Sequence, residues 1–173
     1  AQTHGVQAVG DPVPERGGFR VSQVNLNDGS GEGLRHRELP VETVFEDDTR
    51  RDEMHRKPFG VIAAIAPWNW PLLIAIWQIV PSLRAGNTVV IKPSEYTSIG
   101  TLEMVRLIAE VLPPGVLNTV SGPGEVGAQL VENADIDKIM FTGSSATGSR
   151  IAAIAAKNLI PTTMELGGND AAI

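Results

Sequence analysis

The 173-residue sequence contains no cysteine, which removes several classes of function from these residues. A disulfide, a thiolate metal ligand and a cysteine nucleophile are all excluded within them. The three histidines are scattered among polar residues, and their spacing is unlike that of zinc ligands. They are His4, His36 and His55. We therefore expect no metal site, and by elimination we expect a cytoplasmic protein.

Long apolar runs and an excess of positive charge are also missing. No stretch reaches the roughly 18 uninterrupted apolar residues that a membrane span requires. The first residues lack the charged and apolar regions of a secretory signal. The net charge of −6 argues against a general binder of phosphate backbones, because that function needs a basic surface. We expect neither a nucleic acid nor a membrane as a partner.

The residues that are present indicate a globular chain with three segments of different character. Hydrophobic residues make up 42% of the sequence, which is enough for a core, and 18 glycines and 12 prolines predict many turns. Residues 1–38 are polar and rich in glycine, so we expect an irregular, poorly ordered arm. Residues 39–58 alternate around Asp47 and Asp48, which predicts an exposed hairpin or bridging ribbon. The more apolar residues 59–173 are expected to form the folded domain.

From Gly60 onward, short apolar runs alternate with helical patterns. The run at 61–66 ends at a proline and predicts a buried strand. A helix should follow, with Pro71 in its first turn and Gly86 at its C-terminal cap, and Pro81 should kink or end it. Further strands are predicted at 88–92, 116–120, 138–143 and 162–166, and further helices over 98–112, after 122–127 and over 146–157. This order predicts an α/β fold with a parallel sheet and helices on both faces.

Lys92 and Glu95 follow the second predicted strand, at the edge where ligands bind in such sheets. Glu95 could accept hydrogen bonds from ribose hydroxyls, and Lys92 could donate to the same sugar or to a phosphate. A carboxylate in that place would repel a 2′-phosphate, which favours NAD over NADP. The alternative is a solvated ion pair at a surface turn.

Asn69 follows the first predicted strand, within the stretch PWNWP. Two roles stay open for its carboxamide: a cap for the following helix, or a functional donor. Capping does not explain the tryptophan rings on either side. In the functional alternative, Pro67 and Pro71 would hold Asn69 rigid, and Trp68 and Trp70 would screen it from water.

A glycine-rich turn follows the third predicted strand. The stretch GPGEVG places Gly122, Gly124 and Gly127 before a helix, whose N-terminus offers N–H groups to a pyrophosphate. We expect the turn to depart from the usual dinucleotide-binding fingerprint, and Pro123 removes one possible donor. A plain strand-to-helix turn is the alternative.

Two more candidates lie at the ends of the last two predicted strands. Ser144, in FTGSSATG, could bind a phosphate where the next helix starts, or could simply cap that helix. Glu165, in MELGG, could act as a general base in a partly dry cleft, or could face water. All of these candidates lie at the carboxyl ends of strands, and this shared location is more specific than any one motif.

Five stretches, taken together and in order, resemble the aldehyde dehydrogenase superfamily. They are RKPFGVIAAIAPWNWPL, AGNTVVIKPSE, LPPGVLNTVSGPGEVGAQL, IDKIMFTGSSATG and MELGGNDAAI. The resemblance runs from about Leu39 to Ile173 and is not clear over residues 1–38. In that family an active-site cysteine attacks an aldehyde, hydride passes to NAD(P)⁺, and an activated water hydrolyses the thioester. The resemblance implies a Rossmann-like cofactor domain over residues 59–173, with NAD as the cofactor.

The resemblance also implies a role for each matching residue. Asn69 would be the side-chain donor of the oxyanion hole, and Glu165 would be the general base that activates the hydrolytic water. Lys92 and Glu95 would hold the adenosine ribose, and Ser144 would meet the pyrophosphate. The remaining cofactor contacts would come from Ala66, Pro67, Trp68, Gly122, Gly124, Gly127, Leu166 and Gly167.

The sequence departs from the family in one respect, because it contains no nucleophilic cysteine. We expect it to be the N-terminal part of an aldehyde dehydrogenase, with an incomplete cofactor domain that is inactive alone and at most binds the dinucleotide. A missing catalytic domain or a homo-oligomer would then be its partner. Two alternatives stay open: a non-catalytic structural protein that reuses the fold, and one half of a split enzyme whose nucleophile is on another chain.

Overall fold

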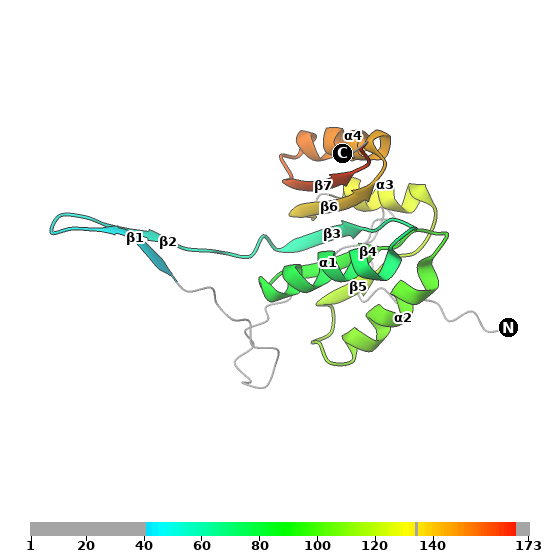
Figure 1. The fold of residues 1–173 in the computed structure, drawn as a ribbon, viewed down its shortest axis with the longest axis horizontal. Coiled ribbons are helices and arrows are strands. Elements are labelled where there is room, and N and C mark those ends of the chain that lie inside the picture. The colour runs from blue at the N-terminus through cyan, green and yellow to red at the C-terminus, as the bar shows by residue number, and fades with distance from the viewer. Residues whose placement is uncertain (1–40, 134, 169–173) are drawn as a thin grey trace, which may run out of the picture.

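The computed structural model describes residues 41–133 and 135–168, which form a ribbon and a layered α/β body (Figure 1). The irregular arm predicted for residues 1–38 lies outside the described residues. The ribbon projects from the body, and the chain enters the first strand of the sheet directly after it (Figure 1).

The ribbon consists of two antiparallel strands, β1 (Glu42–Glu46) and β2 (Arg51–Met54). Asp47 shapes the turn between them, since its Oδ1 accepts hydrogen bonds from the backbone N–H groups of Thr49 at 2.8 Å and Arg50 at 2.9 Å. The hairpin predicted around this aspartate is therefore confirmed.

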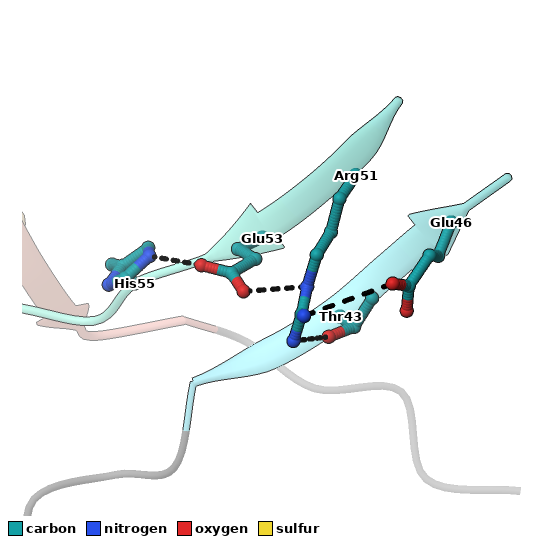
Figure 2. A network of polar contacts seen from close by, with 5 residues as sticks. All are labelled: Thr43, Glu46, Arg51, Glu53 and His55. Carbon is teal, nitrogen blue, oxygen red and sulfur yellow. Dashed lines mark hydrogen bonds and ion pairs between the residues drawn. The ribbon is translucent and has the colours of Figure 1, made fainter. Parts of the chain in front are cut away.

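Polar side chains link the two strands of the ribbon (Figure 2). The guanidinium of Arg51 lies 2.9 Å from Oε1 of Glu53 and 3.3 Å from the hydroxyl of Thr43 on the other strand. A ring nitrogen of His55 lies 3.1 Å from the other oxygen of Glu53. These side chains are largely exposed, so each pair adds only about 0–1 kcal/mol to stability.

The body is a five-stranded sheet whose strands are all parallel, in the order β5-β4-β3-β6-β7. The strands are β3 (Val61–Ile65), β4 (Thr88–Lys92), β5 (Leu117–Thr119), β6 (Lys138–Gly143) and β7 (Thr162–Leu166). Strands β4 and β5 are added on one side of β3, and β6 and β7 are then added on its other side. The strand order therefore reverses between β3 and β6, which makes this place a topological switch point. Ligands bind at such points, outside the carboxyl ends of the strands.

Two hydrophobic cores cover the two faces of this sheet, because the apolar strands are buried on both sides. The helices are α1 (Pro71–Arg84), α2 (Ser98–Ala109), α3 (Gly124–Glu132) and α4 (Ser145–Lys157). Ile62 and Ile91 pack with residues of α1 and α2 on one face. Val61 and Ile139 pack with residues of α3 and α4 on the other. The predicted α/β architecture, with helices on both faces, is confirmed (Figure 1).

Helix α1 starts and ends largely as its sequence predicts. Pro71 occupies the first turn, and Gly86 has a φ of +82° just after the C-cap residue Ala85. The N–H groups of Gly86 and Asn87 reach back to the carbonyls of Leu83 at 2.9 Å and Ser82 at 3.1 Å, which is the Schellman arrangement.

The prediction that Pro81 ends or kinks α1 is wrong as to the end, because the helix continues to Arg84. Pro81 lies on the exposed side of the helix, where the carbonyl that loses its donor can bond to water. Helix α2 is shorter than predicted and ends at Ala109, after which three successive amides bond to carbonyls three residues back. None of the described helices is long and apolar enough to cross a membrane.

Candidate functional site

The predicted site residues lie along one edge of the sheet, because its parallel strands all point their carboxyl ends the same way. Lys92 is the last residue of β4, and Glu165 is the last but one of β7. Asn69 follows β3, and Ser144 follows β6. Helices α3 and α4 also begin at this edge, so their N-terminal amides are available there.

Lys92 is an almost fully buried cation with 4% of its surface exposed. Its Nζ donates to the carbonyl of Pro93 at 3.1 Å and lies 3.5 Å from Oε2 of Glu95. A buried ammonium is costly unless it is paired, and it carries three donors. The described residues use two of them, which leaves one for a ligand.

Glu95 lies beside Lys92 and is nearer to solvent, with 41% of its side chain exposed. Its own backbone amide donates to the carboxylate, and the Lys92 ammonium lies beside it. Both effects hold the pKa of Glu95 below its ordinary value of 4.5. Glu95 is therefore ionised at neutral pH, and in this form both of its carboxylate oxygens accept hydrogen bonds from hydroxyl groups.

The glycine-rich turn between β5 and α3 needs glycine at its first position. Gly122 has a φ of +154°, and a Cβ built there would lie 2.6 Å from Cγ2 of Val126. The expected departure from the dinucleotide fingerprint is wrong as to spacing, since Gly122, Gly124 and Gly127 do follow G-x-G-x-x-G. The departure lies in position, because the fingerprint normally follows the first strand, whereas this turn follows edge strand β5.

Ser144 is the N-cap of α4. Its Oγ accepts a hydrogen bond from the backbone N–H of Thr147 at 3.2 Å and donates to that residue's Oγ1 at 3.0 Å. The capping alternative is therefore realised, and it leaves the first amides of α4 at the sheet edge. The hydroxyl of Ser145 donates to the carbonyl of Gly167 at 3.3 Å, which ties this helix start to the end of β7.

Two glycines around α4 allow a close approach that the sequence motifs do not predict. A Cβ at Gly148 would lie 2.5 Å from Cδ2 of Leu166, and one at Gly143 would lie 2.6 Å from Cζ of Phe141. Because these two glycines have no side chain, the start of α4 can pack closely against β6 and β7. The spacing of the glycines after the strand is the only sequence signal for this contact.

Asn69 and the two tryptophans beside it are exposed within the described part of the chain, whereas Pro67 and Pro71 are half-buried. The predicted screening is not present there, since Trp68 is 64% and Trp70 is 60% exposed. The helix-cap alternative is also wrong, because the N-cap residue is Trp70 and no side chain caps α1. Asn69 makes no hydrogen bond to any described residue, so its carboxamide is free to bind a ligand.

The backbone around this loop is anchored from both sides. The N–H of Ala66 donates to the carbonyl of Lys92 at 3.1 Å, which continues the β3–β4 pairing past the end of β3. The hydroxyl of Thr97 donates to the carbonyl of Trp68 at 3.1 Å. The loop that carries Asn69 is thus held close to the Lys92–Glu95 turn.

Glu165 is paired with Thr142 in the β6–β7 register, and it is exposed among the described residues. The partly dry cleft that was expected around it is not formed by these residues alone. Leu166 is 45% exposed, and nothing described lies within 4 Å of a Cβ placed on Gly167. The end of β7 is therefore open to a ligand or to another part of a protein.

Gln78 is a buried residue at this edge that the motifs do not predict. It lies on α1 with 4% of its surface exposed, and its Nε2 is 3.3 Å from both the carbonyl of Ile65 and the hydroxyl of Thr142. It thereby links the ends of β3 and β6 across the switch point. The available signal was one amide in a helix that is otherwise apolar nearly all round.

This edge fits a dinucleotide better than a metal ion. A buried ammonium, an ionised carboxylate and two helix N-termini can serve ribose hydroxyls and phosphates. Across residues 41–133 and 135–168, no three histidine, aspartate or glutamate side chains gather as they would around a metal.

Comparison with known proteins identifies the family. Residues 21–173 match the aldehyde dehydrogenase family. The chain belongs to this family. The match begins earlier than Leu39, so the expectation that residues 1–38 bear no clear resemblance is wrong for 21–38.

Individual aldehyde dehydrogenases share about half of the aligned residues with this chain. Fluoroacetaldehyde dehydrogenase of Streptantibioticus cattleyicolor is 49% identical over 125 residues, which are 72% of this chain and 24% of that protein. The chloroplastic betaine aldehyde dehydrogenase of Beta vulgaris is 56% identical over 115 residues, 65% of this chain and 23% of that protein. The chain thus spans about a quarter of the length of these relatives.

Solved structures of similar proteins confirm the fold. The enzyme of Mycobacterium tuberculosis, complexed with NAD⁺, superposes with a TM-score of 0.71 at 43% identity, over 75% of this chain and 27% of that one. PnpE of Pseudomonas sp. WBC-3, in complex with nicotinamide adenine dinucleotide, superposes with a TM-score of 0.72 at 45% identity. The match covers 77% of this chain and 28% of PnpE. The Rossmann-like domain expected from the sequence is the domain observed.

Proposed function

We propose that this chain forms the NAD⁺-binding part of an aldehyde dehydrogenase. The observation that carries the proposal is the buried Lys92 ammonium, paired with an ionised Glu95 at the carboxyl edge of a doubly wound sheet. Solved relatives with the same fold contain NAD⁺, which supports this cofactor. When bound, NAD⁺ supplies the acceptor for the hydride that leaves an aldehyde adduct.

The residues of this chain divide the binding of the cofactor among them. Lys92 donates to the adenosine ribose and Glu95 accepts from its hydroxyls, while the negative charge of Glu95 disfavours a 2′-phosphate. The first amides of α3 and α4, after Gly124 and Ser144, face the pyrophosphate. The remaining cofactor contacts are Ala66, Pro67, Trp68, Gly122, Leu166 and Gly167, and Gly127 adjoins the side chain of Lys92.

Two residues are proposed to act on the aldehyde in the complete active site. The free carboxamide of Asn69 donates to the oxyanion of the tetrahedral adduct, a contribution of about 3–4 kcal/mol for such a donor. Glu165 takes a proton from the water that hydrolyses the thioester. The thiolate nucleophile has to come from outside these residues, because they contain no cysteine.

A catalytic segment is the partner that this chain is proposed to need. Apolar side chains stay exposed along α1, next to the Asn69 loop: Leu72, Ile76, Trp77 and Val80. Contiguous exposed apolar residues mark interaction surfaces, and a partner there would lie next to Asn69. Assembly into a homo-oligomer stays a prediction. A cytoplasmic location also stays a prediction, and one similar relative is a peroxisomal enzyme.

Calorimetric titration of the 173-residue chain with NAD⁺ and NADP⁺ tests the cofactor proposal. We expect saturable binding of NAD⁺ and weaker binding of NADP⁺, because Glu95 repels the extra phosphate. No heat of binding at millimolar NAD⁺ would defeat the proposal. Equal affinity for both cofactors would defeat the role given to Glu95.

Complementation tests the catalytic part. The chain is mixed with a polypeptide that carries the remainder of a relative, such as the Beta vulgaris enzyme, and formation of NADH from an aldehyde is followed by absorbance. We expect activity that disappears with Asn69→Ala or Glu165→Gln. Activity that is unchanged by both substitutions would contradict the assigned roles.

A further inference from the structure

Gly127 lies buried in the first turns of α3 and faces the side chain of Lys92 on β4. The position that a Cβ would take at Gly127 is 3.3 Å from Cδ of Lys92 and 3.7 Å from its Cε. The shorter distance is tighter than nine in ten real contacts of a Cβ atom, so the lysine stem would have to shift by a few tenths of an ångström. Only a residue without a side chain leaves the lysine stem where it lies.

We propose that Gly127 is a positioning residue for Lys92. Its missing side chain forms the slot that holds the lysine stem, and this slot sets where the ammonium meets the cofactor ribose. The inference rests on the proposed function, and it adds a task to the one that the third glycine of the fingerprint has. That glycine allows close packing of the helix on a strand, and at Gly127 the packing partner is the stem of Lys92.

Because of the surroundings of Lys92, a small displacement of its aliphatic stem also displaces its ammonium group. The side chain is 5% exposed, so the stem cannot swing out into water. Its Nζ is held by the carbonyl of Pro93 at 3.1 Å and by Glu95 at 3.5 Å. A stem that moves by a few tenths of an ångström therefore has to change the geometry of the Lys92–Glu95 pair.

The neighbouring glycine of the same turn shows that this contact is particular to Gly127. A Cβ at Gly124 would meet nothing described within 4 Å, although both residues belong to the same G-x-G-x-x-G stretch. The close approach to the lysine of β4 is therefore made by Gly127 and not by Gly124.

The test is the Gly127→Ala variant of the complete 173-residue chain. Alanine is the better helix former, so we expect a thermal midpoint at or above that of the wild type. We expect the Kd for NAD⁺ to rise about 5- to 10-fold, because a hydrogen bond from a charged donor is weakened. An unchanged Kd would overturn the proposal.

Gly100→Ala is the matched control. Gly100 lies in the first turn of α2, and the nearest atom to its added Cβ is Cδ2 of Leu72 at 3.5 Å, an ordinary contact. It makes the same chemical change near the start of a helix, at an exposed position, and we expect an unchanged Kd. If Gly127→Ala fails to fold, adding Lys92→Ala should restore folding, and failure of that rescue would also overturn the proposal.

A double variant shows whether Gly127 acts through Lys92. Lys92→Met keeps the stem and removes the charge, so adding Gly127→Ala to it should leave the Kd unchanged. The same fold-change in both backgrounds would mean that Gly127 touches the cofactor directly, and would contradict the proposal.

A crystal structure of Gly127→Ala without cofactor tests the steric step by itself. We expect the Lys92 stem to be displaced and its distance to Glu95 to change, whether or not the chain binds NAD⁺. An undisturbed Lys92 would overturn the inference. Absence of NAD⁺ binding by the wild type would overturn the proposed function instead, so the two failures are distinguishable.

Discussion

Replacement of Lys92 by methionine should weaken NAD⁺ binding without unfolding the chain. The variant keeps a stem of similar length in the buried slot against Gly127 and removes only the ammonium. A hydrogen bond from a charged group contributes about 1.5–3 kcal/mol, so we expect the Kd to rise about 10- to 100-fold. Stability should change little, since an apolar side chain of similar shape replaces a buried charge whose desolvation was costly.

Isothermal titration calorimetry at one ionic strength measures this effect, with thermal unfolding as the check of the fold. Lys57→Met is the matched control, because it removes the same charge from an exposed position between the ribbon and the sheet. The control should bind NAD⁺ with the wild-type Kd. A Lys92→Met chain that is folded and keeps the wild-type Kd would refute the role given to the buried ammonium.

Three further outcomes are expected. The pKa of Glu95 is lowered from its ordinary value of 4.5. The small contribution of its ionised form to folding stability is therefore fully present at a pH above 4.5, and it is lost as the pH falls through the lowered pKa. The Kd for NAD⁺ should therefore stay constant from about pH 7 to about pH 5 and rise only below that range, and a rise near pH 6 would contradict this. Ile139→Ala should lower the free energy of unfolding in urea by about 2–5 kcal/mol because Ile139 is fully buried, whereas Ile99→Ala, at an 83% exposed residue, should change it by less than about 0.5 kcal/mol. Ser144→Ala should cost about 1 kcal/mol in the same assay through loss of the α4 cap, and Ser144→Gly only a few tenths; equal losses would argue against capping.

The strands were predictable almost to the residue, because each is a short apolar run closed by glycine or proline. The predicted limits 88–92, 138–143 and 162–166 are those of β4, β6 and β7. Strand order follows from the same pattern only in part, since the position of β6 beside β3 depends on packing between distant segments. The end of α1 shows the limit of local rules: Pro81 stops a helix only where its missing hydrogen bond cannot be replaced.

The candidate site was predictable as a set of strand ends but not as a set of contacts. Lys92, Glu95 and Ser144 were found from their position after strands, and all lie on one edge. The contact of Gly127 with Lys92 joins residues far apart in the sequence, and no spacing rule indicates it. The exposure of Trp68 and Trp70 was not predictable either, because the burial of a ring depends on what packs against it.

The central claim is that NAD⁺ binds along the carboxyl edge of the sheet. The most direct test is to follow the backbone amide signals of the isotope-labelled chain by NMR during titration with NAD⁺. The account predicts shifts that saturate and that cluster at residues 66–69, 92–95, 122–127, 144–148 and 165–167, with the β1–β2 ribbon unaffected. Shifts confined to the ribbon or to the opposite edge of the sheet, or none at millimolar NAD⁺, would contradict it.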